Sequence, residues 1–167
     1  SLVARPMMSS PRQLFASPDY IAQYGMPLKP EELSKHRCIH TLMDGGRKWH
    51  FLDPHVAVQV NPILTVNNIT FAREAAIAGA GIINVPAFIA EPYVEQGQLV
   101  RVLEHVTLPS SELYALYPSR RFQAMKVKAF IDFMIESLDR FIVLGVEKDA
   151  DALISSPLAL PLDLADQ

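Results

Sequence analysis

The pattern of hydrophobic and polar residues is clearest between Ile63 and Pro86, where it predicts a strand, a helix and a second strand. This stretch reads ILTVNN, then ITFAREAAIAGAG, then IINVP. The first and third pieces are apolar runs rich in β-branched residues, as strands are. The second tolerates a helix from Ile69 to Ala78, which Gly79 can end with a positive φ. Two strands joined by a helix with short connections predict a parallel βαβ unit.

The predicted helix of this unit is apolar around most of its circumference. Only Thr70, Arg73 and Glu74 are polar between residues 69 and 78. A helix of that kind has to be covered on several sides. We therefore expect the βαβ unit to lie inside a layered α/β domain and not at its rim.

Shorter patterns predict the elements on either side of this unit. Ser17 and Pro18 are typical of a helix start, with serine as N-cap and proline at the first position. Apolar alternation and turn residues set the other boundaries. Together the patterns predict strands at 2–5, 12–16, 38–42, 48–52, 56–60, 99–103 and 112–117, and helices at 18–24, 30–36, 87–93 and 122–142.

The turn sequence Asp44-Gly45-Gly46 predicts that the strands at 38–42 and 48–52 form a β-hairpin. This pairing would let His40 and His50 approach each other across the hairpin. Two histidines without a third ligand nevertheless make a poor metal site.

The longest predicted helix, 122–142, carries one apolar stripe of the kind that packs into a core. After it, residues 143–167 are acidic and interrupted by proline, and we expect a loosely ordered tail. The stripe consists of Val127, Phe130, Ile131, Met134, Leu138 and Phe141.

Composition sets limits on the class of protein. The chain has 167 residues, of which 50% are hydrophobic and 20% charged, the balance of about one globular domain. A net charge of -3 provides no basic surface for nucleic acid. The single cysteine, Cys38, excludes an intramolecular disulfide and fits a reducing cytoplasm. No apolar run reaches the roughly 18 residues of a membrane-spanning helix.

Thr65, Asn67 and Asn68 form the best candidate site, where the first strand of the βαβ unit turns into its helix. In open α/β sheets, ligands collect beyond the carboxyl ends of the strands. Free backbone N–H groups and the positive end of the helix dipole face the same spot. This combination favours a small anion or a polar oxygen. The alternative is structural, because asparagine is a common helix N-cap and threonine a common strand residue.

Sequence motifs for catalysis, metals and dinucleotides are absent. The histidines have neither HExxH spacing nor a CxxC partner, and no GxSxG elbow occurs. Gly79-Ala80-Gly81 follows a predicted helix instead of preceding one, so it is no dinucleotide loop. No carboxylate pair lies at a predicted strand end. We therefore expect no enzyme activity, no metal and no cofactor.

Nine segments occur in a specific order over about residues 1–140. They are SLVARPM at 1–7, LFASPDYIAQYGMP at 14–27, EELSKHRCI at 31–39, WHF at 49–51, VNN at 66–68, AREAAIAGAGIINVPAFIA at 72–90, GQLVRVL at 97–103, LYALYPSRR at 113–121 and KVKAFIDFMIE at 126–136. No single segment is specific, but in combination they resemble the effector-binding domain of LysR-type transcriptional regulators.

This resemblance implies a two-lobed α/β fold similar to type II periplasmic solute-binding proteins, with a small effector bound between the lobes. On that layout, residues 1–118 form a complete lobe II, with a mixed sheet and helices on both faces. Residues 119–142 form the second crossover and the C-terminal helix of lobe I, and residues 143–167 form the tail. The rest of lobe I and a DNA-binding N-terminal helix-turn-helix would lie outside this sequence.

The missing part of lobe I would leave the apolar stripe of helix 122–142 without the sheet it packs on. Uncovered apolar side chains cost roughly 25 cal/mol per Å² of surface. We therefore expect the stripe to be exposed, to fold onto lobe II or to be buried by self-association.

The resemblance also assigns roles to particular residues. The turn that contains Thr65, Asn67, Asn68 and Ile69 would line the effector cleft. The hinges between the lobes would lie near the two crossovers, and two residues there are candidate hinge residues. They are Arg5 and Tyr117, which ordinary strand positions explain equally well.

The implied function is effector sensing within a cytoplasmic, homo-oligomeric regulator of transcription. Its partners would be a small-molecule effector, anionic if the helix start binds it, and DNA through the missing helix-turn-helix alone. Two alternatives share the same architecture, namely a solute-binding protein of a transporter and an enzyme such as a deaminase-like protein. A signal peptide upstream of Ser1 would favour the transporter protein, and a helix-turn-helix would favour the regulator.

Overall fold

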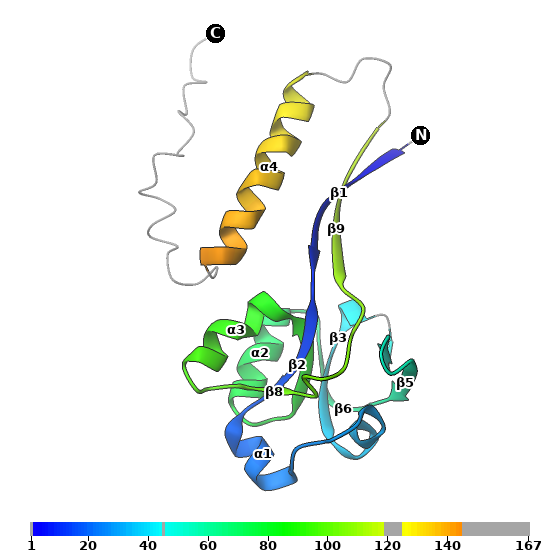
Figure 1. The fold of residues 1–167 in the computed structure, drawn as a ribbon, viewed down its shortest axis with the longest axis vertical. Coiled ribbons are helices and arrows are strands. Elements are labelled where there is room, and N and C mark those ends of the chain that lie inside the picture. The colour runs from blue at the N-terminus through cyan, green and yellow to red at the C-terminus, as the bar shows by residue number, and fades with distance from the viewer. Residues whose placement is uncertain (1, 45, 119–124, 145–167) are drawn as a thin grey trace.

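Two strands from opposite ends of the chain, β1 (Leu2–Ser10) and β9 (Ser111–Pro118), pair into a long antiparallel ribbon that rises from the body of the protein (Figure 1). The structure is a computed structural model that describes residues 2–44, 46–118 and 125–144. The ribbon therefore brings residues 2–10 and 111–118 together at one side of the body.

A five-stranded mixed sheet forms the centre of the body, with strand order β6-β3-β7-β2-β8. The strands β3, β6 and β7 are parallel, whereas β2 runs antiparallel to its neighbours β7 and β8. Strand β7 is buried at every position. The five strands are β2 (Arg12–Ala16), β3 (Arg37–Thr41), β6 (Asn61–Val66), β7 (Ile82–Pro86) and β8 (Val100–Val102).

Helices cover both faces of this sheet, as the sequence predicted. One face packs against α1 (Pro18–Tyr24), the 3₁₀ helix η1 (Pro30–Lys35) and the hairpin of β4 (Lys48–Phe51) and β5 (Val56–Gln59). The contacts form a cluster that includes Tyr20, Leu33 and Trp49. The other face packs against α2 (Ile69–Ile77) and α3 (Ala87–Glu95) through a cluster that includes Phe15 and Ala76.

The start of α1 follows the predicted cap. Ser17 is extended, and its hydroxyl accepts a hydrogen bond from the Tyr20 N–H at 3.1 Å, while Pro18 occupies the first turn. This bond satisfies one of the free N–H groups of a helix N-terminus. Gly25 ends the helix with φ of +84°, a conformation that glycine adopts without strain.

The predicted βαβ unit is present as β6, α2 and β7, but its expected position was wrong. Strand β3 lies between β6 and β7, so the unit spans three strands. Strand β6 is an edge strand with no buried residue, and Phe71 on α2 is 57% exposed. The part of the unit formed by β6 and α2 therefore lies at the rim, whereas β7 is the central strand of the sheet. The buried side of α2 consists of small residues and Arg73, which stacks on Tyr93.

The predicted hairpin between residues 38–42 and 48–52 was also wrong. Strand β4 (Lys48–Phe51) pairs with β5 (Val56–Gln59), and η2 (Leu42–Asp44) follows β3. The sequence showed turn residues but not the pairing partner, because β3 satisfies its backbone groups by parallel pairing with β6 and β7. His40 and His50 accordingly do not face each other across a hairpin.

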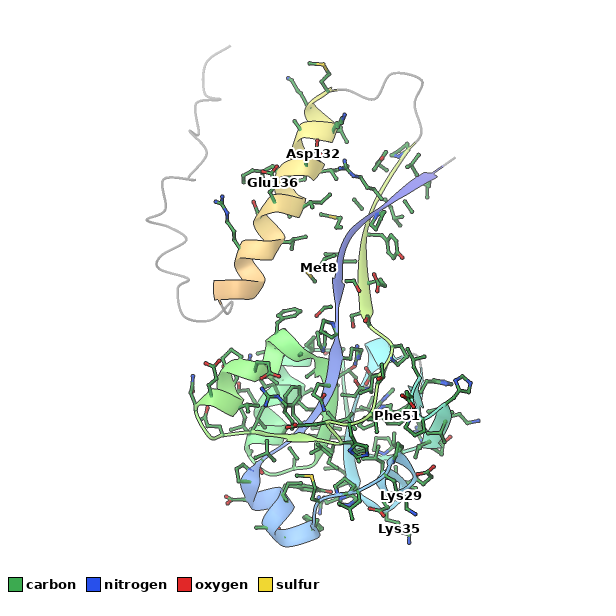
Figure 2. The ribbon with its side chains drawn as sticks, in the orientation of Figure 1. Met8, Lys29, Lys35, Phe51, Asp132 and Glu136 are labelled. Carbon is green, nitrogen blue, oxygen red and sulfur yellow. The ribbon has the colours of Figure 1, made fainter. Side chains whose placement is uncertain are left out.

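Strand β1 is longer than predicted, because it continues through Pro6 to Ser10. A register shift interrupts the ribbon between Pro6 and Met8, where one residue of β1 has no partner on β9. Proline cannot donate a ladder hydrogen bond, so it is tolerated beside such a bulge. Figure 2 shows Met8 on the ribbon between the body and the last helix.

The last helix, α4 (Met125–Leu144), lies alongside the ribbon and packs against β1 (Figure 1). Ile131 is buried at 6% exposure, whereas Val127 and Phe130 are 40% and 63% exposed. The expected stripe is thus partly exposed and partly folded onto the ribbon. The predicted tail from residue 143 onward lies, after Leu144, outside the described residues, as does the segment 119–124.

Candidate functional site

One edge of the five-stranded sheet gathers the carboxyl ends of its parallel strands and the start of β2. Register pairs Arg12 with Pro86 and Thr41 with Val66, so β2 begins where β3, β6 and β7 end. The base of the ribbon lies at the same edge, because only Pro11 separates β1 from β2. Ligands of open α/β sheets bind at such an edge.

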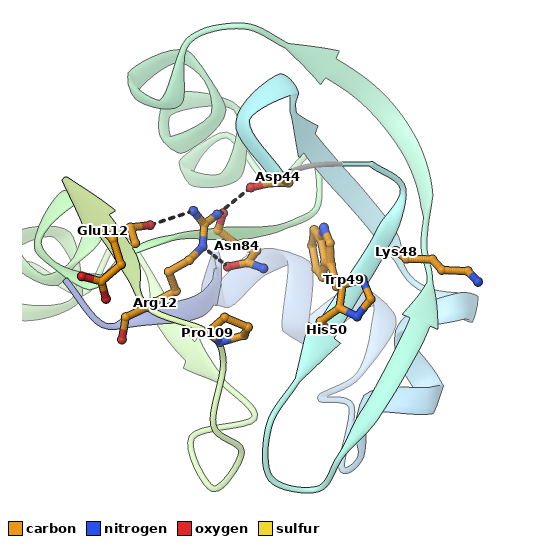
Figure 3. A pocket seen from close by; sticks show the side chains of 10 residues that line it. Arg12, Asp44, Lys48, Trp49, His50, Asn84, Pro109 and Glu112 are labelled. Carbon is orange, nitrogen blue, oxygen red and sulfur yellow. Dashed lines mark hydrogen bonds and ion pairs between the residues drawn. The ribbon is translucent and has the colours of Figure 1, made fainter. Parts of the chain in front are cut away.

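A pocket with a volume of about 360 Å³ opens at this edge (Figure 3). It lies between the start of β2, the loop after β3, the strand β4 and the start of β9. A volume of that size is at the lower end of the range for small-molecule sites. The lining residues are Arg12, Asp44, Lys48, Trp49, His50, Asn84, Pro109, Ser110, Ser111 and Glu112.

Arg12 is the centre of the polar wall of this pocket. Its guanidinium donates to Asp44 Oδ1 at 2.6 Å, to Asn84 Oδ1 at 2.9 Å and to Ser111 Oγ at 3.1 Å. A further hydrogen bond goes to the carbonyl oxygen of Asn84. One side chain therefore joins β2, β7, η2 and β9 at the base of the ribbon.

Asp44 is fixed from two directions. Its Oδ1 pairs with Arg12, and its Oδ2 accepts the backbone N–H of Thr41 at 3.0 Å. His40 Nδ1 lies 3.6 Å from the same oxygen and is buried. Because the Asp44 side chain is only 2% exposed, these partners provide the compensation that a buried carboxylate requires.

The remaining walls differ in polarity. Trp49 is 1% exposed and, with Pro109, forms an apolar surface beside Asn84. Lys48 and His50 are exposed residues of β4, and Figure 3 shows the Lys48 ammonium directed away from Arg12. Glu112, on the opposite side, accepts a hydrogen bond from Ser9 at 2.6 Å.

Comparison with models of known protein families shows to which family this chain belongs. A model of the LysR substrate binding domain matches residues 1–139. The chain belongs to this family. The fold found here, a mixed sheet with helices on both faces, agrees with that membership and confirms the resemblance seen in the sequence.

Curated relatives of this LysR-family chain are transcriptional regulators. It is 33% identical over 146 residues to an HTH-type transcriptional regulator of Xanthomonas campestris, covering 83% of this chain and 42% of that protein. It is 34% identical over 128 residues to PtxR of Pseudomonas aeruginosa, covering 75% of this chain and 41% of that protein. The chain thus spans less than half the length of these relatives.

Solved structures show the same fold. The regulatory domain of CrgA, a LysR-type regulator from Neisseria meningitidis, matches with a TM-score of 0.69 and 26% identity over 81% of this chain and 68% of that domain. The full-length Vibrio cholerae virulence activator AphB matches with a TM-score of 0.70 and 28% identity over 82% of this chain and 48% of AphB.

The site predicted from the sequence lies beside the pocket of this LysR-family chain and not in it. Thr65, Asn67 and Asn68 are exposed at the end of β6, and Ile69 is half-buried at the start of α2. Asn68 Oδ1 accepts hydrogen bonds from the N–H groups of Thr70 at 2.8 Å and Phe71 at 3.2 Å. Its side-chain oxygen therefore serves as the N-cap of α2.

The two predicted hinge residues lie in the ribbon, on the side of the bulge away from the body. Arg5 pairs with Ala115, and its guanidinium forms an ion pair with Asp132 of α4 at 2.6 Å. Tyr117 pairs with Val3 and is half-buried. Arg5 thus attaches α4 to the ribbon, while the register shift lies between Pro6 and Met8.

Sequence reasoning missed the residues that build the pocket. Arg12 was an ordinary first residue of a predicted strand, and Asp44 was assigned to a hairpin turn. Asn84 carried a usable signal, because it is the one polar residue in the apolar run from Ile82 to Pro86. A polar residue in a buried strand requires a partner.

Two other features of the described residues bear on chemistry. Within residues 2–44, 46–118 and 125–144, no three histidine, cysteine, aspartate or glutamate side chains are grouped so that they could hold a metal ion. None of the helices in the same part of the chain is both long and apolar enough to cross a membrane.

Proposed function

We propose that this chain is the effector-sensing part of a cytoplasmic, homo-oligomeric, DNA-binding transcriptional regulator. A small-molecule effector binds at the carboxyl edge of the sheet, and DNA is bound by a part of the protein outside this sequence. The module itself performs no catalysis. A ligand of this kind acts only through its different affinity for two arrangements of the protein.

The observation that carries this proposal is the position of the pocket. It lies at the base of the ribbon formed by β1 and β9, and Arg12 links its polar wall to Ser111, the first residue of β9. A ligand in the pocket therefore contacts the segments that connect the body to the rest of the protein. Binding energy at this place can act on the near half of the ribbon and, through the bulge between Pro6 and Met8, on the orientation of its far half.

The turn after β6 completes the proposed effector site. Thr65, Asn67, Asn68 and Ile69 lie at the same sheet edge as the pocket, at the positive end of the α2 dipole. The hinge lies in the ribbon, with Arg5 and Tyr117 on the far side of the bulge from the body. On the family layout, lobe II would end at residue 118, and the expected boundary at 142 falls within the last turn of α4, which ends at Leu144.

A variant that fills the pocket with a large side chain tests the proposal. In the full-length protein, Ser110→Tyr places a large side chain at an exposed position of the pocket lining. We expect this variant to bind operator DNA and to lose the response of DNA affinity to effector, measured by fluorescence anisotropy with a panel of small acids and amides. An unchanged response would contradict the proposal.

A matched control variant is Lys35→Tyr. Lys35 is exposed at the end of η1, and Figure 2 shows it at the end of the body opposite the ribbon. This substitution adds the same side chain far from the pocket, so it should leave the effector response as it is in the parent protein. A loss in both variants would indicate a general effect of the added tyrosine.

A further inference from the structure

Asn84 presents a hydrogen-bond donor to the pocket that has no partner among the described residues. Its Oδ1 accepts from Arg12 Nε at 2.9 Å. A guanidinium only donates, so the amide oxygen must face Arg12 and the NH₂ group must face the other way. Figure 3 shows this group directed toward Trp49. Asn84 as a whole is 7% exposed and lines the pocket, so a ligand there can accept a hydrogen bond from this group.

The charged side chains next to Asn84 already form an ion pair with each other. Arg12 and Asp44 form an ion pair at 2.6 Å, with 15% and 2% of their side chains exposed. Both oxygens of Asp44 have partners, one in Arg12 and the other in the N–H of Thr41. Two donors of the pocket lining are therefore left without a partner among the described residues, the NH₂ group of Asn84 and the buried indole N–H of Trp49.

The neighbouring wall provides apolar surface for the body of a ligand. Trp49 and Pro109 both line the pocket, and Figure 3 shows them on either side of the space in front of Asn84. Small-molecule sites typically combine such apolar walls with a few directed polar groups.

The geometry points to a ligand with a carboxylate or carbonyl oxygen on a short apolar body. We infer that this oxygen accepts a hydrogen bond from Asn84 Nδ2, while the body lies against Trp49 and Pro109. Asn84 is thus the residue that selects ligands with an acceptor over ligands that only donate. This inference rests on the proposed function, since it names the ligand class of the same pocket.

Three one-ring probes of similar size test this inference by NMR titration of the ¹⁵N-labelled full chain. Benzoate carries an anionic acceptor, benzamide a neutral acceptor, and benzylammonium donors alone. We expect benzoate, benzamide or both to shift the Asn84 side-chain NH₂ resonances, which are assigned by their loss in Asn84→Asp. Benzylammonium should leave them in place. The two acceptor probes separate a carboxylate from a carbonyl ligand.

Two aspartate variants locate the site. Asn84→Asp keeps an acceptor for Arg12 and replaces the donor with a second oxygen, so we expect binding of the acceptor probes to weaken about tenfold or more. Gln98→Asp adds the same charge at an exposed position near the end of β2 away from the pocket, where Val100 pairs with Ala16. It should leave probe binding within about twofold of the parent protein. Thermal melting verifies that both variants are folded.

Three results would overturn the inference: no shift at Asn84 with either acceptor probe, equal shifts with benzylammonium, or weakening by Gln98→Asp but not by Asn84→Asp. A different result would show that the proposed sensor function is wrong while the ligand inference holds. In that case the probes bind at Asn84 as expected, while the affinity of the full-length protein for operator DNA does not respond to any effector.

Discussion

Arg12 Nη2 lies 2.6 Å from Asp44 Oδ1, and this contact joins the first residue of β2 to the helical turn η2 that follows β3. Hydrogen bonds from the same guanidinium reach Asn84 and Ser111. The pair therefore fixes the segments that surround the pocket. It also makes the charge balance of a buried carboxylate depend on Arg12, which is the only arginine or lysine paired with Asp44 among the described residues.

Replacing Arg12 by methionine should destabilise the protein strongly. The change leaves the Asp44 carboxylate buried without its cation, and removing one partner of a buried pair costs about 3–5 kcal/mol. Urea unfolding of the parent and variant proteins measures this loss in the free energy of unfolding. The matched control is Arg101→Met, which breaks an exposed pair with Glu91 and should cost about 0–1 kcal/mol. Equal losses in the free energy of unfolding for the two variants would contradict the argument that a buried ion pair contributes more than an exposed one.

Replacing Asn68 by alanine should lower stability even without any ligand. Asn68 Oδ1 caps α2 through the N–H groups of Thr70 and Phe71, and loss of an N-cap costs about 1 kcal/mol. Asn68→Asp and Asn68→Ser keep an acceptor at this position and should be close to the parent protein in thermal melting. If Asn68→Ala melts like the parent protein, the cap contributes little in solution.

The Cys38 thiol should be unreactive in the folded protein. Burial raises its pKa from 9.0 to about 12, so the thiolate that reacts is nearly absent at neutral pH. Labelling with a disulfide reagent at pH 8 should be slow in buffer and fast in denaturant. Rapid labelling of the native protein would show that the region around β3 opens readily.

The same shift predicts how stability depends on pH. The folded thiol has the higher pKa, so the unfolded state loses its proton first as the pH rises above 9. The contribution of Cys38 is therefore fully present below pH 9 and is lost between pH 9 and about 12. Cys38→Ala should show a smaller fall in the free energy of unfolding over this range than the parent protein.

Replacing Gly81 by alanine should destabilise the start of β7. A Cβ atom there would lie 2.5 Å from the backbone oxygen of Arg37, and backbone cannot move aside without disturbing β3. We expect a loss of about 1–3 kcal/mol, as for other overpacked sites. Gly97→Ala is the comparison, because its Cβ meets open space and only the positive φ of +74° opposes it. A smaller loss at Gly81 than at Gly97 would contradict the steric argument.

Replacing Phe130 by lysine should reduce self-association of this chain. Phe130 is 63% exposed on α4, close to Val127 at 40%, and exposed apolar surface of this kind promotes association. Light scattering should report a lower apparent mass for Phe130→Lys with little change in melting temperature. Ile131→Lys, at a position only 6% exposed, should instead release α4 from the ribbon. An identical mass for parent and Phe130→Lys would exclude this face from association.

Local signals predicted most of the elements correctly, because they depend on neighbours in sequence. The Ser17 cap of α1 and the Asn68 junction before α2 are examples. Pairing depends on distant segments, and there the predictions failed. The turn at Asp44 indicated a hairpin, but β3 pairs with β6 and β7 instead. The helix α2 was expected to be covered on several sides, but it has an exposed side because β6 lies at the sheet edge.

The candidate site was only partly predictable for the same reason. Thr65, Asn67 and Asn68 follow one another closely, so the sequence places them together. Arg12, Asp44 and Asn84 are separated by dozens of residues and meet only because β2 runs beside β7 while η2 follows β3. No local pattern specifies such a meeting. Whether the turn after β6 contacts an effector stays a prediction.

Strand β2 lies inside the sheet, between β7 and β8, and only Pro11 separates it from the ribbon strand β1. The ribbon is therefore rooted in the interior of the body and not in a peripheral loop. A tilt of the ribbon cannot be absorbed by a flexible edge, because the same stretch of backbone continues among Leu14, Phe15 and Ala16, which are fully buried. The body and the near half of the ribbon should consequently move as one rigid body. Bending of the ribbon should occur at the unpaired residue between Pro6 and Met8.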